Sequence, residues 1–258
     1  VCIVCAVEFP ASDARLRQPP AVGDGETTRR PNSERIAGDF ARRETQAERV
    51  RRADIMFVLD CTKSMSGEIN AIRDTIIAFT ETIRSEGVRA RVGLIEFRDR
   101  RINEDHRVLL FDGQVFTGDP EAFRREVSTL RAAGGGDEPE SSLDALMLAL
   151  RQPFDPTGSK VIVLITDAPP HVPDLETQSV EETVDAISHA GINQFYVVTK
   201  LRKKQNEVYT QMLGSLRNQG VERAVAFNLG DGDDFSARAE DFKGVLMNLV
   251  KPITQGTR

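Results

Sequence analysis

Apolar residues follow two alternating patterns from about residue 53 onward. Continuous apolar runs, as at 55–59 and 161–165, predict strands that are covered on both faces. Between the runs, apolar residues recur three and four positions apart, as in 69–83, and this spacing predicts amphipathic helices. Strands that alternate with helices predict an α/β fold: a doubly wound, mostly parallel six-stranded sheet with helices on both faces.

The same patterns predict the bounds of each element. The predicted strands cover residues 55–59, 91–97, 161–165, 194–199 and 223–227, with an edge hairpin over 108–117 that turns at Asp112-Gly113. The predicted helices cover residues 69–83, 120–130, 140–150, 180–190, 206–218 and 239–250. In such sheets, ligands bind outside the carboxyl ends of the strands, where the strand order reverses.

Composition changes abruptly near the start of the first strand. The segment 1–52 contains four prolines and many charged residues, and it lacks apolar periodicity. We therefore expect a flexible tether over 1–52, with one short charged helix from about 34 to 52. The α/β domain is expected over 53–252, and a disordered tail over 253–258.

The cysteines limit the covalent chemistry of this sequence. Cys2, Cys5 and Cys61 are too few for a disulfide framework or a four-thiolate zinc site. The opening Val-Cys-Ile-Val-Cys-Ala fits the second knuckle of a zinc ribbon that begins upstream, the end of an export signal, or an apolar pair without function. A sequence without a disulfide framework favours the cytoplasm, while an export signal would place it outside.

Charge and hydropathy argue against nucleic-acid binding and against a membrane-spanning helix. The sequence has 40% hydrophobic and 29% charged residues, and it contains no apolar run of the roughly 20 residues that span a bilayer. The net charge of −6 argues against nucleic acid, whose binding requires clustered Lys and Arg.

Candidate chemistry gathers where two predicted strands end. Asp60 follows the run 55–59, and Asp167 follows the run 161–165. Asp60, Thr62 and Ser64 alternate along one turn, so that three oxygens can converge while the intervening side chains face away. Mg²⁺ prefers about six oxygen ligands, several of them from water. Taken singly, these residues are ordinary turn and cap residues; together they favour a divalent metal site.

Asp60-x-Thr62-x-Ser64 resembles the Asp-x-Ser/Thr-x-Ser signature of von Willebrand factor type A (vWA) domains, whose Rossmann-like fold carries a metal-ion-dependent adhesion site. The segment 165–171 resembles the family's loop after the fourth strand, which places Asp167 as the second acid. The run Gly-Gly-Gly-Asp-x-Pro-Glu at 134–140 occupies the position of a third loop, as in a bacterial-type branch of the family. Asp137 stands there where a Thr is usual.

The resemblance implies a non-catalytic module that binds a protein partner through a divalent cation. The expected ion is Mg²⁺, with Mn²⁺ or Ca²⁺ as alternatives, and the implied metal residues are Asp60, Thr62, Ser64, Asp137 and Asp167. A carboxylate of the partner would complete the coordination. The third acid, Asp137, should hold the metal more firmly and weaken its attraction for acidic ligands.

Two other functions compete with this interpretation. A phosphotransfer enzyme of the haloacid dehalogenase type would use Asp60 as nucleophile with Mg²⁺. It needs a second acid where Thr62 stands, and a Lys for which Lys160 lies on the wrong side of its strand. A scaffold module in a larger intracellular signalling assembly is the other alternative. Two of the three histidines, His106 and His189, are expected away from the strand-end edge, and His171 is expected in a loop near the site.

Overall fold

The computed structural model describes residues 52–85, 89–136, 138–229 and 244. The strands are β1 (Arg52–Asp60), β2 (Arg89–Phe97), β3 (Arg107–Val108), β4 (Ser159–Ile165), β5 (Gln194–Thr199) and β6 (Arg223–Asn228). The α-helices are α2 (Ile69–Ser85), α3 (Pro120–Val127), α4 (Ser142–Leu150), α5 (Val180–His189) and α6 (Glu207–Asn218), and the 3-10 turns are η1 (Lys63–Gly67), η2 (Arg100–Ile102) and η3 (Lys204–Asn206).

The six strands form one sheet in the order β3-β2-β1-β4-β5-β6. Neighbouring strands are parallel except for the short edge strand β3, which is antiparallel to β2. The chain leaves β1 toward β2 and β3 on one side, and later fills the other side with β4, β5 and β6. The strand order therefore reverses between β1 and β4, and this is where doubly wound sheets bind ligands.

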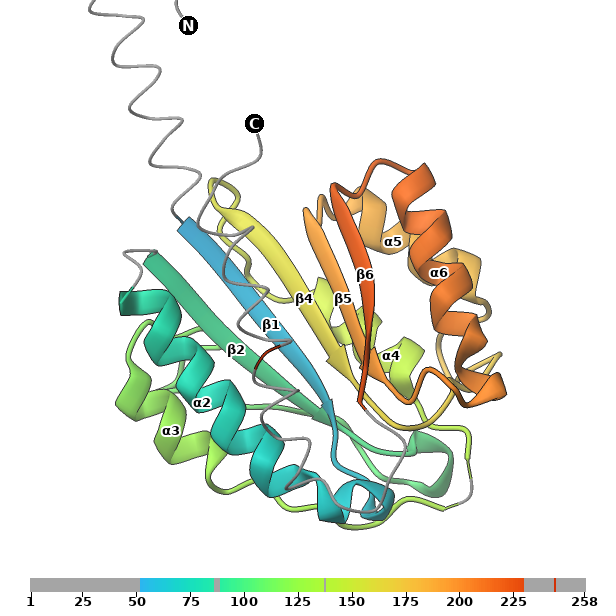
Figure 1. Ribbon diagram of the computed structural model, residues 1–258, viewed down its shortest axis with the longest axis horizontal. Coiled ribbons are helices and arrows are strands. Elements are labelled where there is room, and N and C mark those ends of the chain that lie inside the picture. The colour runs from blue at the N-terminus through green and yellow to red at the C-terminus, as the bar shows by residue number, and fades with distance from the viewer. Residues whose placement is uncertain (1–51, 86–88, 137, 230–243, 245–258) are drawn as a thin grey trace, which may run out of the picture. The chain divides into compact units, whose positions relative to one another are not determined.

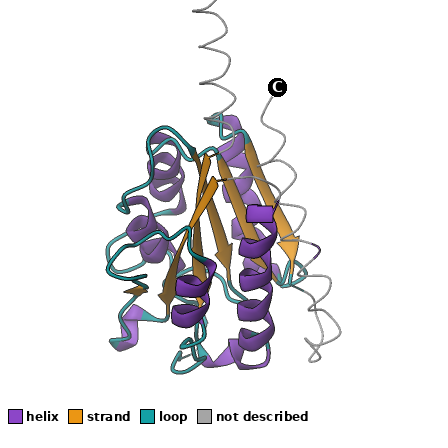
Figure 2. Ribbon diagram, turned by 90° about the vertical axis from the view of Figure 1, so that its left-hand side faces the viewer, coloured by secondary structure: helices purple, strands orange, loops and turns teal. Residues whose placement is uncertain are grey.

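Helices cover both faces of the sheet (Figures 1 and 2). Alternate residues of β1 enter two different cores: Phe57 packs with α2 and α3, whereas Val58 packs with α4, α5 and α6. Both layers are apolar, which explains why the run 55–59 shows no polar alternation. The predicted fold class, a mostly parallel six-stranded α/β sheet covered on both faces, is confirmed.

Some predicted details differ from the structure. The segment expected as an edge hairpin keeps its two-residue turn, with positive φ at Asp112 and Gly113. Its two arms pair mainly with β2, because Val108 lies opposite Ile95 and Thr117 opposite Val92. The edge strand is thus interrupted by a loop.

The helix expected over 140–150 begins at Ser142, because the backbone of Glu140 forms a bridge with Pro170 instead. The tether before residue 52, its charged helix and the tail 253–258 lie outside the described residues, as does the last predicted helix apart from helical Gly244. The domain bounds 53–252 stay a prediction.

Candidate metal centre

Two predicted acids meet at the carboxyl edge of the sheet. Asp60 is the last residue of β1, and Asp167 follows β4 by two residues. Because β1 and β4 pair in parallel, both acids emerge at the point where strand order reverses. Asp60 is fully buried, and Asp167 is 3% exposed. These two predicted site residues therefore lie where doubly wound sheets bind ligands.

Four oxygens form a continuous chain at this point, and Asp60, Thr62, Ser64 and Asp167 are together called the oxygen cluster. Thr62 Oγ1 lies 2.6 Å from Asp60 Oδ1 and 3.0 Å from Ser64 Oγ. Ser64 Oγ lies 2.9 Å from Asp167 Oδ1, across 103 residues of chain. Asp60 is held from behind, because Thr166 Oγ1 lies 2.7 Å from its Oδ2 atom.

The oxygen cluster has fewer hydrogens than contacts. With both carboxylates ionised, the three oxygen–oxygen contacts share only the two hydroxyl hydrogens of Thr62 and Ser64. If Thr62 donates to Asp60 and Ser64 donates to Asp167, the contact between the two hydroxyls has no hydrogen. Such a surplus of lone pairs is what a bound cation requires.

The oxygen spacing also fits a small divalent ion. At a metal–oxygen distance of about 2.1 Å, neighbouring ligands of an octahedron lie roughly 3.0 Å apart. The Thr62–Ser64 and Ser64–Asp167 distances of 3.0 and 2.9 Å match this edge. No group of three or more His, Cys, Asp or Glu side chains in the described ranges could hold a metal. A metal here would therefore depend on the hydroxyls.

The backbone after β1 explains the convergence. Thr62 has an extended conformation (φ −71°, ψ 165°) and precedes the 3-10 turn η1, so residues 60, 62 and 64 face the same point. The intervening side chains face away, because Cys61 is packed in the core and Lys63 is exposed. Burial raises the pKa of the Cys61 thiol well above its ordinary value, which leaves this cysteine without nucleophilic character.

The loop over residues 134–140, here called the glycine loop, contacts the oxygen cluster directly. The Lys63 amide donates to the Gly134 carbonyl at 3.0 Å, and Gly135 has a φ of +74°. A Cβ atom on Gly135 would lie 2.8 Å from Thr62 Cβ, closer than real Cβ contacts allow. Glycine is thus required here by both space and backbone conformation. Asp137 lies outside the described residues, and its role as a ligand stays a prediction.

Besides the predicted acids, Glu140 also lies near the oxygen cluster, and the sequence prediction did not include it. It is 3% exposed, and its Oε2 atom has no hydrogen-bond partner among the described residues. Burial, followed by repulsion from Asp60, raises the pKa of Glu140 to about 8. Its backbone ties the glycine loop to the Asp167 loop, through Glu140 N to Pro169 O and His171 N to Glu140 O, both at 2.9 Å. In the sequence, the Pro139-Glu140 pair before a predicted helix is the one feature that could have drawn attention to Glu140.

Two lysines after β5 also lie close to the oxygen cluster, and no sequence pattern predicted their role. Lys200 Nζ donates to Asp167 Oδ2 at 2.9 Å. Lys203 pairs with Glu138, and its Nζ lies 3.4 Å from the Asp167 carbonyl oxygen. The environment of Asp167 is therefore partly cationic.

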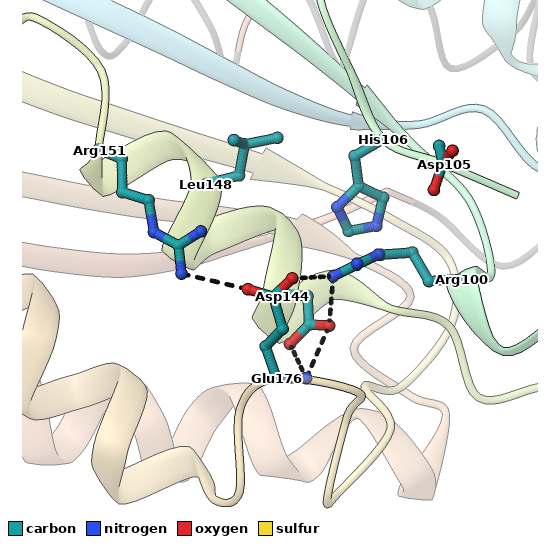
Figure 3. A pocket seen from close by; sticks show the side chains of 7 residues that line it. All are labelled: Arg100, Asp105, His106, Asp144, Leu148, Arg151 and Glu176. Carbon is teal, nitrogen blue, oxygen red and sulfur yellow. Dashed lines mark hydrogen bonds and ion pairs between the residues drawn. The ribbon is translucent and has the colours of Figure 1, made fainter.

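An ion-pair cluster fixes the loops beside the site (Figure 3). Arg100 Nη1 contacts Asp144 at 2.9 Å and Glu176 at 2.8 Å, and so joins the loop after β2 to α4 and to the segment before α5. These residues line a cavity of about 260 Å³ together with Arg151 and His106. This ion-pair cluster ties the loop after β2 and the segment before α5 to helix α4, beside the carboxyl edge of the sheet.

The histidines are only partly where they were expected. His171 lies in the predicted loop, with Nε2 3.1 Å from Asp99 Oδ1. His106, expected away from the strand-end edge, stacks edge-on against Phe97 at the end of β2. The reason is that β3 is antiparallel, so the segment leading into it starts at the carboxyl edge.

The structure also bears on the enzyme alternative. Lys160 lies at the amino end of β4, where its Nζ donates to Ala190 O at 2.9 Å. This is the edge opposite Asp60, so Lys160 cannot act on a group bound there.

In the described part of the chain, no helix is long and apolar enough to cross a membrane.

Comparisons with known proteins identify the fold family. Residues 54–222 match the sequence profile described as "von Willebrand factor A domain". Over 120 residues, or 46% of this chain, identity is 37% to human von Willebrand factor A domain-containing protein 7 and 30% to the alpha-protein kinase vwkA of Dictyostelium discoideum. The matches span 12% and 19% of those proteins, so less than a fifth of either relative is compared.

Solved structures agree on the fold. The pilus adhesin SpaC of Lactobacillus rhamnosus GG, in its open conformation, aligns with a TM-score of 0.55 at 14% identity, over 79% of this chain and 30% of its own. The PilB minor pilin of Streptococcus sanguinis aligns with a TM-score of 0.51 at 12% identity, over 79% and 61%. Because the profile covers more than half of the sequence, the chain belongs to the von Willebrand factor A domain family.

Proposed function

We propose that this domain binds a divalent cation in the oxygen cluster and engages a protein partner through it. The observation that carries the proposal is the hydrogen deficit of the cluster: three contacts of 2.6 to 3.0 Å share two hydroxyl hydrogens at the reversal point of the sheet. Mg²⁺ is the expected ion because the cluster supplies only hard oxygen donors, and Mn²⁺ and Ca²⁺ are the alternatives.

Each residue of the oxygen cluster has a distinct part in this proposal. Thr62 and Ser64 supply hydroxyl oxygens, and Asp167 supplies the Oδ1 oxygen that faces Ser64. Asp60 holds Thr62 in position and provides negative charge from a fully buried site. Asp137 is proposed as a further acid of the same site. When bound, the metal supplies an electrophilic position for a carboxylate of the partner.

A thermal melt tests metal binding directly. A ligand that binds only the folded state adds about 2.7 kcal/mol at a roughly hundredfold excess over its Kd. For a domain of this size, that corresponds to a rise in Tm of roughly 5 to 10 °C. We expect Mg²⁺ or Mn²⁺ to raise the Tm above its value in chelator, and Asp60→Ala to abolish the rise.

Two further variants make the melt interpretable. Ser64→Ala changes an exposed residue and should keep the fold while reducing the metal-induced rise. Asp74→Ala removes an exposed acid of α2 and should leave the rise unchanged. An identical Tm in chelator and in millimolar metal for the wild-type protein would refute the proposed metal site.

A second assay addresses the enzyme alternative. The domain is incubated with Mg²⁺ and a generic aryl phosphate, and phosphate release is measured. We expect no turnover, because Thr62 stands where a second acid would be needed and Lys160 lies at the opposite edge. Turnover that Asp60→Asn abolishes would overturn the proposal of a binding module.

A further inference from the structure

Lys200 is placed beside the oxygen cluster by the sheet itself. It follows β5, which pairs in parallel with β4. The Thr166 amide donates to the Val198 carbonyl at 3.1 Å, which keeps the two strand ends together. Asn206 is 1% exposed, and its Nδ2 atom donates to the Lys200 carbonyl at 3.2 Å. The backbone of Lys200 is thus held from both sides.

The two carboxylate oxygens of Asp167 have different partners. Oδ1 accepts a hydrogen bond from Ser64 at 2.9 Å and faces the oxygen cluster. Oδ2 accepts one from the Lys200 ammonium, also at 2.9 Å. The side chain of Asp167 is 4% exposed and that of Lys200 is 27% exposed, so the pair interacts more strongly than charges in bulk water. A fixed positive charge therefore lies one carboxylate away from the proposed metal.

We propose that Lys200 is the residue that sets which ligands the metal-loaded site accepts; this inference rests on the metal site proposed above. The carboxylates of Asp60 and Asp167 together balance a divalent ion, Asp137 as a further acid of the proposed site would add one negative charge, and Lys200 offsets it with one positive charge. That charge opposes binding of the metal cation and favours binding of an anion. Lys200 thus lowers the metal affinity and selects partners that present a carboxylate.

A purely orienting role for Lys200 predicts the opposite result for the metal. If the lysine only holds the Asp167 carboxylate in place, its removal frees that side chain and weakens metal binding. If its charge dominates, removal strengthens metal binding. The sign of the change in metal affinity therefore separates the two roles.

The test compares wild type with Lys200→Gln, Lys200→Arg and a matched control, Lys204→Gln. Lys204 lies four residues further along, in η3, and is exposed. Calorimetry measures the Kd of Mn²⁺ and then the Kd of a glutamate-containing peptide for the Mn²⁺-loaded protein. We expect Lys200→Gln to bind Mn²⁺ about tenfold more tightly and the peptide about tenfold more weakly, each change being about 1.4 kcal/mol. Lys200→Arg and Lys204→Gln should remain close to wild type.

Melts in chelator provide a readout that does not depend on the partner. Without Lys200 the buried Asp167 carboxylate loses its cation, so the Tm of Lys200→Gln in chelator should fall and its metal-induced rise should exceed that of wild type. Unchanged or weaker Mn²⁺ binding by Lys200→Gln, with normal wild-type binding, overturns the role of Lys200 alone. A wild-type protein that takes up no Mn²⁺ overturns the metal site itself.

Discussion

Gly135 offers a sharp test of how the glycine loop shapes the oxygen cluster. Its φ of +74° lies in the left-handed region, and a Cβ atom would meet Thr62 Cβ at 2.8 Å and Glu140 Oε1 at 3.3 Å. Gly135→Ala should therefore cost stability twice, once through backbone strain and once through displacement of Thr62.

The two costs have different sizes. A non-glycine residue in the left-handed region costs about 1 to 2 kcal/mol. Forcing a methyl group into packed surroundings adds about 1 to 3 kcal/mol. The two costs sum to about 2 to 5 kcal/mol; at about 2 to 4 °C per kcal/mol, we expect Gly135→Ala to lower the Tm by roughly 4 to 20 °C.

Gly113→Ala is the matched control. Gly113 has a similar φ of +81°, but no atom lies within 4 Å of its Cβ position. Gly113→Ala should lose only the stability due to backbone strain, about 1 to 2 kcal/mol, and should keep the wild-type affinity for Mn²⁺. Thermal melts measure both stabilities, and calorimetry measures both Mn²⁺ affinities.

Metal affinity decides the outcome. Because Thr62 must move to accommodate the new methyl group, Gly135→Ala should weaken Mn²⁺ binding at least tenfold. If both alanine variants lose the same stability and bind Mn²⁺ equally, the glycine loop does not position Thr62, and the packing argument is wrong.

The remaining predictions concern two other titratable groups. Asp137→Thr removes one negative charge and should weaken Mn²⁺ binding while strengthening binding of a glutamate-containing peptide; calorimetry measures both, and an unchanged metal affinity would place Asp137 outside the site. Burial, and then repulsion from Arg100, lowers the pKa of His106 from 6.5 to about 4, so the fold favours the neutral ring. The wild-type protein should therefore be destabilised relative to His106→Gln as pH falls from about 6.5 to about 4, by at most roughly 3 kcal/mol. Denaturant titrations at pH 7 and pH 4.5 test this, and an equal loss of stability in both proteins would contradict it.

The sequence was most informative where burial is complete. The strands β1 and β4 are covered on both faces, so their continuous apolar runs identified them and the acids that follow. The hairpin prediction failed in part, because the local pattern of a turn does not say which strand each arm pairs with. The pairing depends on β2, because both arms pair with the edge of β2 that faces away from β1.

The missed residues depend on contacts between distant segments. From the sequence, Glu140 was predicted as the first residue of a helix. In the structure it is buried, and its backbone forms a bridge with Pro170. In the sequence, Lys200 looks like an ordinary solvent-exposed lysine after a strand. Its contact with Asp167 forms only because β4 and β5 pair. Lys200 has no sequence signal, and the Pro-Glu pair at Glu140 indicates only the start of a helix, so the proximity of both residues to the oxygen cluster follows from the assembled sheet.

The long chain separations within the oxygen cluster have a consequence for the order of folding. Ser64 meets Asp167 across 103 residues, and Thr166 meets Asp60 across 106. These contacts cannot form until β1 and β4 are paired, and closing so long a loop is slow compared with forming local helices. We therefore expect the oxygen cluster to assemble late in folding. Interactions made there act mainly on the rate of unfolding, so a ligand of this site prolongs the lifetime of the folded domain without hastening its formation.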